Sequence, residues 1–171
     1  MKLLNKTQIK TIRQLQKNLD IRVRENNDIP MDKDLNLEKY LALKTELFEF
    51  VNEIESFKYW KKHKGKDHIL EEACDTLHFI FSLAIDNNVE IVQNQEDVKD
   101  FDMNKYDTND LIGILDACIS DIFISKDWEE LSTALTFLTV ILTKQGFTAK
   151  DLYEEYLRKN KVNHERQDNN Y

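Results

Sequence analysis

The sequence is poor in the two residues on which turns and phosphate-binding loops depend. Of its 171 residues, three are glycine and one is proline. An all-β sandwich or barrel needs frequent turns, and a Rossmann or P-loop protein needs glycines where its backbone meets a phosphate. The composition therefore argues against both classes and favours a mostly helical protein.

Cysteine and long apolar runs are also scarce, and negative charge exceeds positive. Cys74 and Cys118 lie in helical patterns without metal-ligand spacing, so we expect reduced thiols in a cytoplasmic protein. The first residues lack the hydrophobic run of a signal peptide, and the longest apolar stretch, residues 134–142, is too short to cross a bilayer. The net charge of −8 argues against a nucleic-acid polymer or an anionic membrane as partner. The negative charge is still compatible with a small phosphorylated ligand that is bound through metal ions.

Apolar residues recur at helical spacing along most of the chain, which predicts an all-α bundle of about six helices in one domain, residues 1–171. The first five predicted helices cover residues 7–24, 36–58, 67–86, 109–124 and 128–144. Residues 87–107 form an acidic connector without an assignable motif.

The C-terminal part carries clear helix-end signals. Gly146 is expected to end the fifth helix, and Thr148 with Asp151 forms a capping box for the last helix, which passes through Tyr153 and Tyr156. Residues 159–171 are polar without apolar periodicity, and we expect them to form a flexible tail that closes over a substrate.

Two pairs of carboxylates lie on the second and third predicted helices. Glu46 and Glu49 are three residues apart, as are Glu72 and Asp75, so each pair points to nearly the same side of its helix. An isolated pair of this kind is usually a solvated helix face. Here the second pair shares its face with Phe79, which indicates a partly buried site. Hard cations would relieve the repulsion, and Mg²⁺ is the natural choice because it bridges carboxylates to phosphates.

With these motifs, the sequence resembles the dimeric all-α deoxyuridine triphosphatases (dUTPases) of the all-α NTP pyrophosphatase superfamily, particularly phage and Firmicute members. The resemblance is carried by E-x-x-E at 46–49, F-K-Y-W-K at 57–61, E-x-x-D-x-x-H-F at 72–79 and K-N-x-x-N-x-x-R-Q-x-x-x-Y at 159–171. A weaker echo is L-Q at 15–16. The order and spacing of these motifs are specific, and they span nearly the whole chain.

The resemblance implies a homodimer that hydrolyses dUTP, and dUDP as a further substrate, to dUMP. This reaction lowers dUTP and supplies dUMP for thymidylate synthesis. The metal ligands would be Glu46, Glu49, Glu72 and Asp75, holding two or three Mg²⁺ ions, with Mn²⁺ as a substitute. A metal-held water becomes a nucleophile near neutral pH. Glu49, or in second place Glu46, would take its proton as general base.

The resemblance also implies which residues bind the nucleotide. They are Gln16, Asp20, Trp60, Lys61, His78, Phe79, Lys159, Asn160 and Arg166. Lysine and arginine suit phosphates, and side-chain amides offer both a donor and an acceptor to uracil. Phe79 would lie under the deoxyribose, and Trp60 beside the base. Asp20 stands where some relatives carry asparagine. Lys159 and Arg166 could instead belong to a solvated basic tail. Trp60 could instead be an aromatic residue of an interface or of the core.

Two other interpretations stay open on the sequence alone. One is a related pyrophosphatase that prefers another nucleotide such as dCTP, because base selection depends on few side chains. The other is a helical interaction protein with solvated acidic faces that binds a regulator, such as a repressor-type protein if the chain is phage-encoded. The cations of the tail beside a four-carboxylate cluster favour the nucleotide enzyme over an interaction module.

Overall fold

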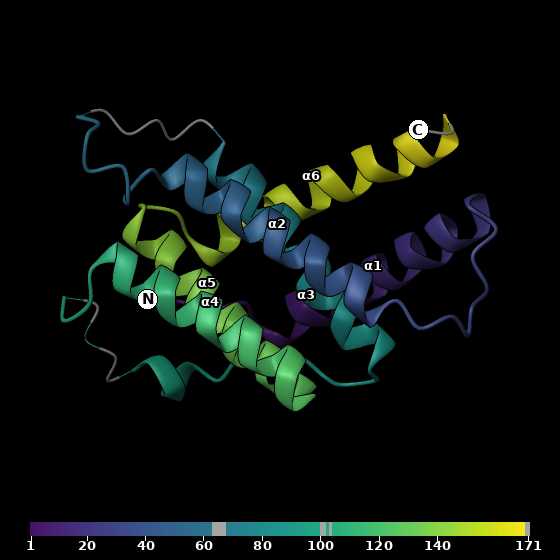
Figure 1. The fold of residues 1–171 in the computed structure, drawn as a ribbon, viewed down its shortest axis with the longest axis horizontal. Helices are drawn as coiled ribbons and strands as arrows, with labels where there is room; N and C mark the ends of the chain where they lie inside the picture. Colours follow the sequence, from purple (N-terminus) through teal and green to yellow (C-terminus); the bar gives the residue numbers. More distant parts are fainter. Residues whose placement is uncertain (63–67, 100–101, 103, 170–171) are drawn as a thin grey trace.

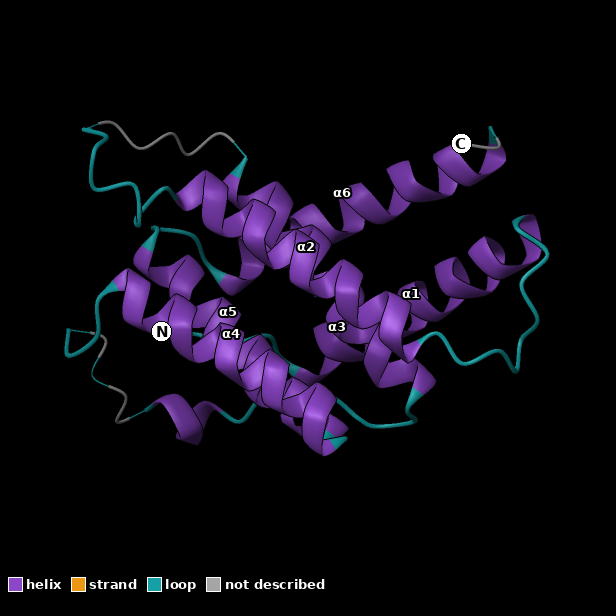
Figure 2. Cartoon of the chain, viewed as in Figure 1, coloured by secondary structure: helices purple, strands orange, loops and turns teal. Residues whose placement is uncertain are grey.

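The computed structural model describes residues 1–62, 68–99, 102 and 104–169. Tyr171, the last residue of the predicted C-terminal motif, lies outside these residues. The described part of the chain contains helices and no strand, as Figures 1 and 2 show, so the predicted all-α class is confirmed. The α-helices are α1 (Lys6–Asn26), α2 (Asn36–Ile54), α3 (Ile69–Asp86), α4 (Thr108–Ser125), α5 (Leu131–Lys144) and α6 (Ala149–Asp168). Two short 3₁₀-helices are η1 (Gln95–Val98) and η2 (Trp128–Glu130).

Helix α3 is the centre of the bundle. It contacts α1, α2, α5 and α6, and its buried residues, Leu77, Phe81 and Ala84 among them, lie on most sides of the helix. A helix that is apolar around most of its circumference is stable only when other helices surround it. Helices α1 and α6 contact each other and run side by side in Figure 1, while α2 packs on α3 through Leu43 and Leu47. The polar residues of α3 therefore face the space between α1, α2 and α6.

The predicted helix ends near residue 146 are confirmed. Gly146 has a φ of 90°, a conformation that glycine adopts without strain, and the Phe147 N–H donates to the Leu142 carbonyl at 3.0 Å. Thr148 and Asp151 form the reciprocal capping box that opens α6. These contacts set the direction in which α6 returns to the bundle.

Three helix boundaries differ from the prediction by three residues or more. Helix α5 begins at Leu131 rather than at residue 128, because residues 128–130 form η2. Helix α2 stops at Ile54, four residues early, because Glu55 takes a left-handed backbone conformation (φ 58°) and its carboxylate binds Lys58 and Lys61. Helix α6 continues to Asp168, so residues 159–168 are helical rather than irregular. The buried side of α6 carries the polar residues Lys159 and Asn160 here. A helix prediction that depends on the spacing of apolar residues therefore misses this part of α6. No described helix is long and apolar enough to span a membrane.

Candidate active site

A cavity of about 560 Å³ opens between α1, α2, α3 and α6. It brings together seven of the predicted site residues: Gln16, Asp20, Glu46, Asp75, His78, Phe79 and Arg166. Along α3 the lining residues follow helical spacing, from Asp75 through Phe79 to Ser82, so one face of this helix forms a wall of the cavity. Residues from four helices that the sequence predicted for one site therefore line one cavity.

Three carboxylates converge at one end of the cavity. One oxygen from each of Glu46, Glu72 and Asp75 lies within 4.8 Å of the others, and all three side chains are half-buried. Burial, followed by the neighbouring Asp75, raises the pKa of Glu46 to about 7. Burial is also the main cause that raises the pKa of Glu72 and of Asp75. Carboxylates that resist ionisation in this way fit a hard divalent cation, which takes oxygen ligands.

Glu49 stands beside this group but is not part of it. Its side chain is exposed, while its negative charge contributes to the raised pKa values of Glu46 and Glu72. The structure thus gathers three of the four predicted ligands closely and places the fourth at their solvent side.

The cations of the C-terminal motif reach this end of the cavity from α6. Lys159 is buried and forms ion pairs with Asp75 and with Glu71, the latter at 3.2 Å. Arg166 is exposed at the cavity lining, and its positive charge acts to lower the pKa of Asp75. The carboxylates and the C-terminal cations therefore form one electrostatic unit across α3 and α6.

Four predicted nucleotide-binding residues do not line the cavity: Lys159, whose ion pairs are described above, and Trp60, Lys61 and Asn160. Trp60 follows α2 and is 64% exposed, and Lys61 binds Glu55, the residue that ends α2. Asn160 is buried on α6, one turn after Tyr156. The side chains of Trp60 and Lys61 thus lie at the surface beside the end of α2.

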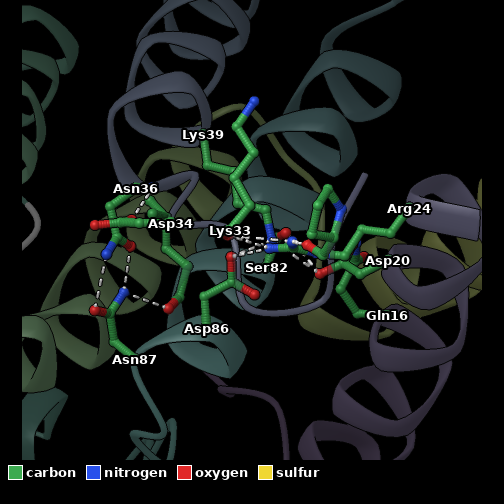
Figure 3. Close-up of polar contacts among 12 residues, drawn as sticks. Gln16, Asp20, Arg24, Lys33, Asp34, Asn36, Lys39, Ser82, Asp86 and Asn87 are labelled. Carbon is green, nitrogen blue, oxygen red and sulfur yellow. Dashed lines mark hydrogen bonds and ion pairs between the residues drawn. The ribbon is translucent and has the colours of Figure 1, made fainter. Parts of the chain in front are cut away.

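The other end of the cavity holds a network of charged and polar side chains that Figure 3 shows in close-up. Asp20 Oδ2 accepts a hydrogen bond from Ser82 Oγ at 2.7 Å and lies 3.4 Å from Lys39 Nζ. Asp86 Oδ2 lies 2.7 Å from the same ammonium group and 3.4 Å from Arg24. These pairs tie α1, α2 and α3 together and fix the walls of the cavity.

The sequence carries a signal for these additional residues. Ser82 and Asp86 follow Asp75 by seven and eleven positions, and Lys39 precedes Glu46 by seven, so each lies on the same face as a predicted metal ligand. A search for polar residues at helical spacing from Glu46 and Asp75 would have identified Lys39, Ser82 and Asp86.

His78 is buried beside the cavity and contacts Gln16. Its Nδ1 lies 2.6 Å from Gln16 Oε1, and its ring stacks on Tyr156 with 4.5 Å between centroids. Burial, followed by the charge of Lys159, lowers the pKa of His78 to about 3. The ring is therefore neutral at physiological pH, which suits a fixed hydrogen-bonding role better than proton transfer.

Two comparisons with known proteins bear on the family to which the chain belongs. A search of curated proteins finds no significant match to the chain. A protein-family profile described as dUTPase matches residues 8–171, which include every helix except the first two residues of α1. Because this match covers nearly the whole sequence, the chain belongs to the all-α dUTPase family, the enzymes that hydrolyse dUTP.

Proposed function

We propose that the protein hydrolyses dUTP to dUMP and pyrophosphate in a Mg²⁺-dependent reaction with water. The observation that carries this proposal is the order of side chains along α3. Charged Asp75 is followed by apolar Phe79 and then by Ser82 with its polar network, over about 10 Å of helix. This order of charged, apolar and polar surface matches the triphosphate, sugar and base of a nucleotide.

Glu46, Glu72 and Asp75 would hold the metal ions, two or three in number, and Mn²⁺ would substitute for Mg²⁺. Bound Mg²⁺ supplies neutralisation of the phosphate charge and acidifies a water molecule. The close approach of three half-buried carboxylate oxygens supports this role. Burial first, and the neighbouring carboxylates after it, raise the pKa of Glu46, Glu72 and Asp75 although Lys159 is paired to Asp75, and a bound cation would offset both effects.

The remaining charged residues would act on the water and on the phosphates. Glu49 takes the proton of the attacking water, because it is exposed beside the three ligands. Arg166 contacts the phosphate chain, to which a guanidinium offers two parallel donors. Lys159 lies closer to the carboxylates and holds Asp75 in place. Movement of the end of α6 towards bound substrate would exclude water from the cavity.

We also propose that the protein is a homodimer. Helix α2 buries one face against α3, yet Leu37, Leu41 and Phe48 on this helix are 53%, 54% and 50% exposed. These residues recur at helical spacing and form an apolar stripe that a second copy of the chain would cover. Sedimentation velocity gives the mass in solution, and a monomer at all concentrations would contradict this part of the proposal.

The proposed activity is tested by measuring pyrophosphate release from dUTP, dCTP, dTTP and UTP, with Mg²⁺ and with EDTA. We expect turnover of dUTP far above that of the other nucleotides, full loss in EDTA and recovery when Mg²⁺ is restored. Preference for dCTP would support the related pyrophosphatase instead. Absence of metal-dependent turnover of any nucleotide would contradict the proposal.

Replacing Phe79 with alanine is expected to weaken the discrimination between dUTP and UTP by about tenfold, the scale on which an apolar wall distinguishes closely related groups. Phe79 lines the cavity between its charged and polar ends, where a 2′-hydroxyl would meet the ring. The measurement is the ratio of kcat/KM for the two nucleotides. Phe147→Ala, outside the cavity lining, serves as the control, and an unchanged ratio in Phe79→Ala would remove the ring from sugar recognition.

A further inference from the structure

Gln16 is an almost completely buried polar side chain whose amide has three polar partners. It lies on α1, is 3% exposed and lines the cavity. Its amide meets side chains from three helices: Asp20 one turn later on α1, His78 on α3 and Tyr156 on α6. Because each of these partners has a definite hydrogen-bonding character, the orientation of the amide can be worked out.

Asp20 identifies the nitrogen end of the amide. Gln16 Nε2 lies 2.7 Å from Asp20 Oδ1, and the other oxygen of Asp20 accepts from Ser82 and faces Lys39. A carboxylate paired with an ammonium group accepts hydrogen bonds and donates none. The amide atom beside Asp20 is therefore the donor, and Figure 3 shows Gln16, Asp20 and Ser82 grouped in this way.

The oxygen end of the amide is fully engaged. The Tyr156 hydroxyl donates to Gln16 Oε1 at 2.9 Å, and His78 Nδ1 lies 2.6 Å from the same oxygen. An oxygen only accepts, so His78 must carry its proton on Nδ1. Both lone pairs of the oxygen are then used, and the second N–H is the only group that the amide has left for a ligand.

We propose that Asp20 and Tyr156 are positioning residues that lock the Gln16 amide so that it presents a donor, and never an acceptor, to the base in the cavity. This inference rests on the proposed function. A donor fits the carbonyl oxygen that uracil has where cytosine has an amino group. With cytosine, the N–H of Gln16 would face an amino group, which is also a donor. Both buried groups would then lack a hydrogen bond, and this would weaken binding.

Tyr156 is suited to this task because it is held from several sides. It is fully buried, its hydroxyl also lies 3.3 Å from the Ile12 carbonyl oxygen, and its ring stacks on His78. Burial raises the pKa of Tyr156 well above its usual range, so the hydroxyl keeps its proton. Removing the hydroxyl leaves only Asp20 and His78 to hold the amide, so the amide can rotate more easily and present its oxygen to a ligand.

The test is Tyr156→Phe, assayed with dUTP and dCTP in the presence of Mg²⁺. We expect the ratio of kcat/KM for dUTP to that for dCTP to fall about 3–10-fold, the loss that one hydrogen bond produces, mainly through KM. Tyr153→Phe, three residues earlier on α6 and half-buried, is the matched control and should keep the wild-type ratio. A Tyr156→Phe protein that folds and retains the full ratio would overturn the proposal.

A second measurement is independent of turnover. Nitrogen NMR of protein labelled at histidine should show His78 as the neutral tautomer protonated at Nδ1 between pH 5 and 8. A proton on Nε2 would overturn the assignment of the amide even in an active enzyme. Failure of the wild-type protein to hydrolyse dUTP would instead contradict the proposed function, and the tautomer would still report on the network.

Discussion

Glu49→Gln is expected to lower kcat for dUTP hydrolysis by about 10²–10⁴-fold, the contribution of a positioned general base. Glutamine keeps the size of the side chain but cannot take a proton from water. Glu49 is exposed beside the oxygens of Glu46, Glu72 and Asp75, so its replacement should leave the bundle folded. The rate loss should therefore appear in kcat, with a small change in the melting temperature.

Pyrophosphate release at saturating dUTP measures this effect, and circular dichroism reports on the fold. Glu154→Gln, an exposed carboxylate on α6, is the control and should retain the wild-type rate. Raising the Mg²⁺ concentration should not rescue Glu49→Gln if the residue acts on the water, whereas rescue would identify it as a metal ligand. A nearly normal kcat would remove Glu49 from the mechanism and leave Glu46 as the base.

The helices could be predicted from the sequence because their signals are local. Apolar spacing and the capping box at Thr148 each involve residues within a few turns of one another. The end of α2 was not predictable in this way. It depends on Glu55, whose left-handed backbone is accompanied by ion pairs to two lysines that follow it in an irregular segment.

In the candidate site, too, local features could be predicted from the sequence and contacts between distant residues could not. The pairing of carboxylates within each helix follows from their spacing, and the family resemblance placed Gln16, Phe79 and Arg166 at the same site. The pairing of Lys159 with Asp75, and of Tyr156 with Gln16, joins residues more than 80 positions apart. Such contacts depend on how α6 packs against α1 and α3, which side-chain spacing within one helix does not encode.

Glu46→Gln is expected to stabilise the metal-free protein at pH 8, although it removes a proposed metal ligand. Burial and then the neighbouring Asp75 raise the pKa of Glu46 to about 7, above its ordinary value of 4.5. Between these two values the folded protein keeps a proton that the unfolded chain releases. The free energy of unfolding therefore falls as pH rises from 4.5 to 7, and the full penalty is present above pH 7.

We expect the metal-free variant to melt about 2–4 °C above the wild type at pH 8, the shift that about 1 kcal/mol produces in a domain of this size. The side chain is partly exposed, and solvent screening limits the gain to this scale. The difference should shrink steadily as pH is lowered from 7 towards 4.5, where the wild-type glutamate becomes protonated in both states. Calorimetry in EDTA across this range measures it, with Glu53→Gln, two turns later on α2, as the control.

At saturating Mg²⁺ we expect the wild type to be more stable than Glu46→Gln, the reverse of the order without metal. A ligand that binds the folded state alone raises its stability, and the wild type offers the cation one more carboxylate. The variant would then be the more stable protein without metal, the less stable one with it, and inactive in both conditions. A Glu46→Gln protein that melts below the wild type in EDTA at pH 8 would show that Glu46 already has a compensating partner. The repulsion among the three carboxylates would then no longer support a metal site.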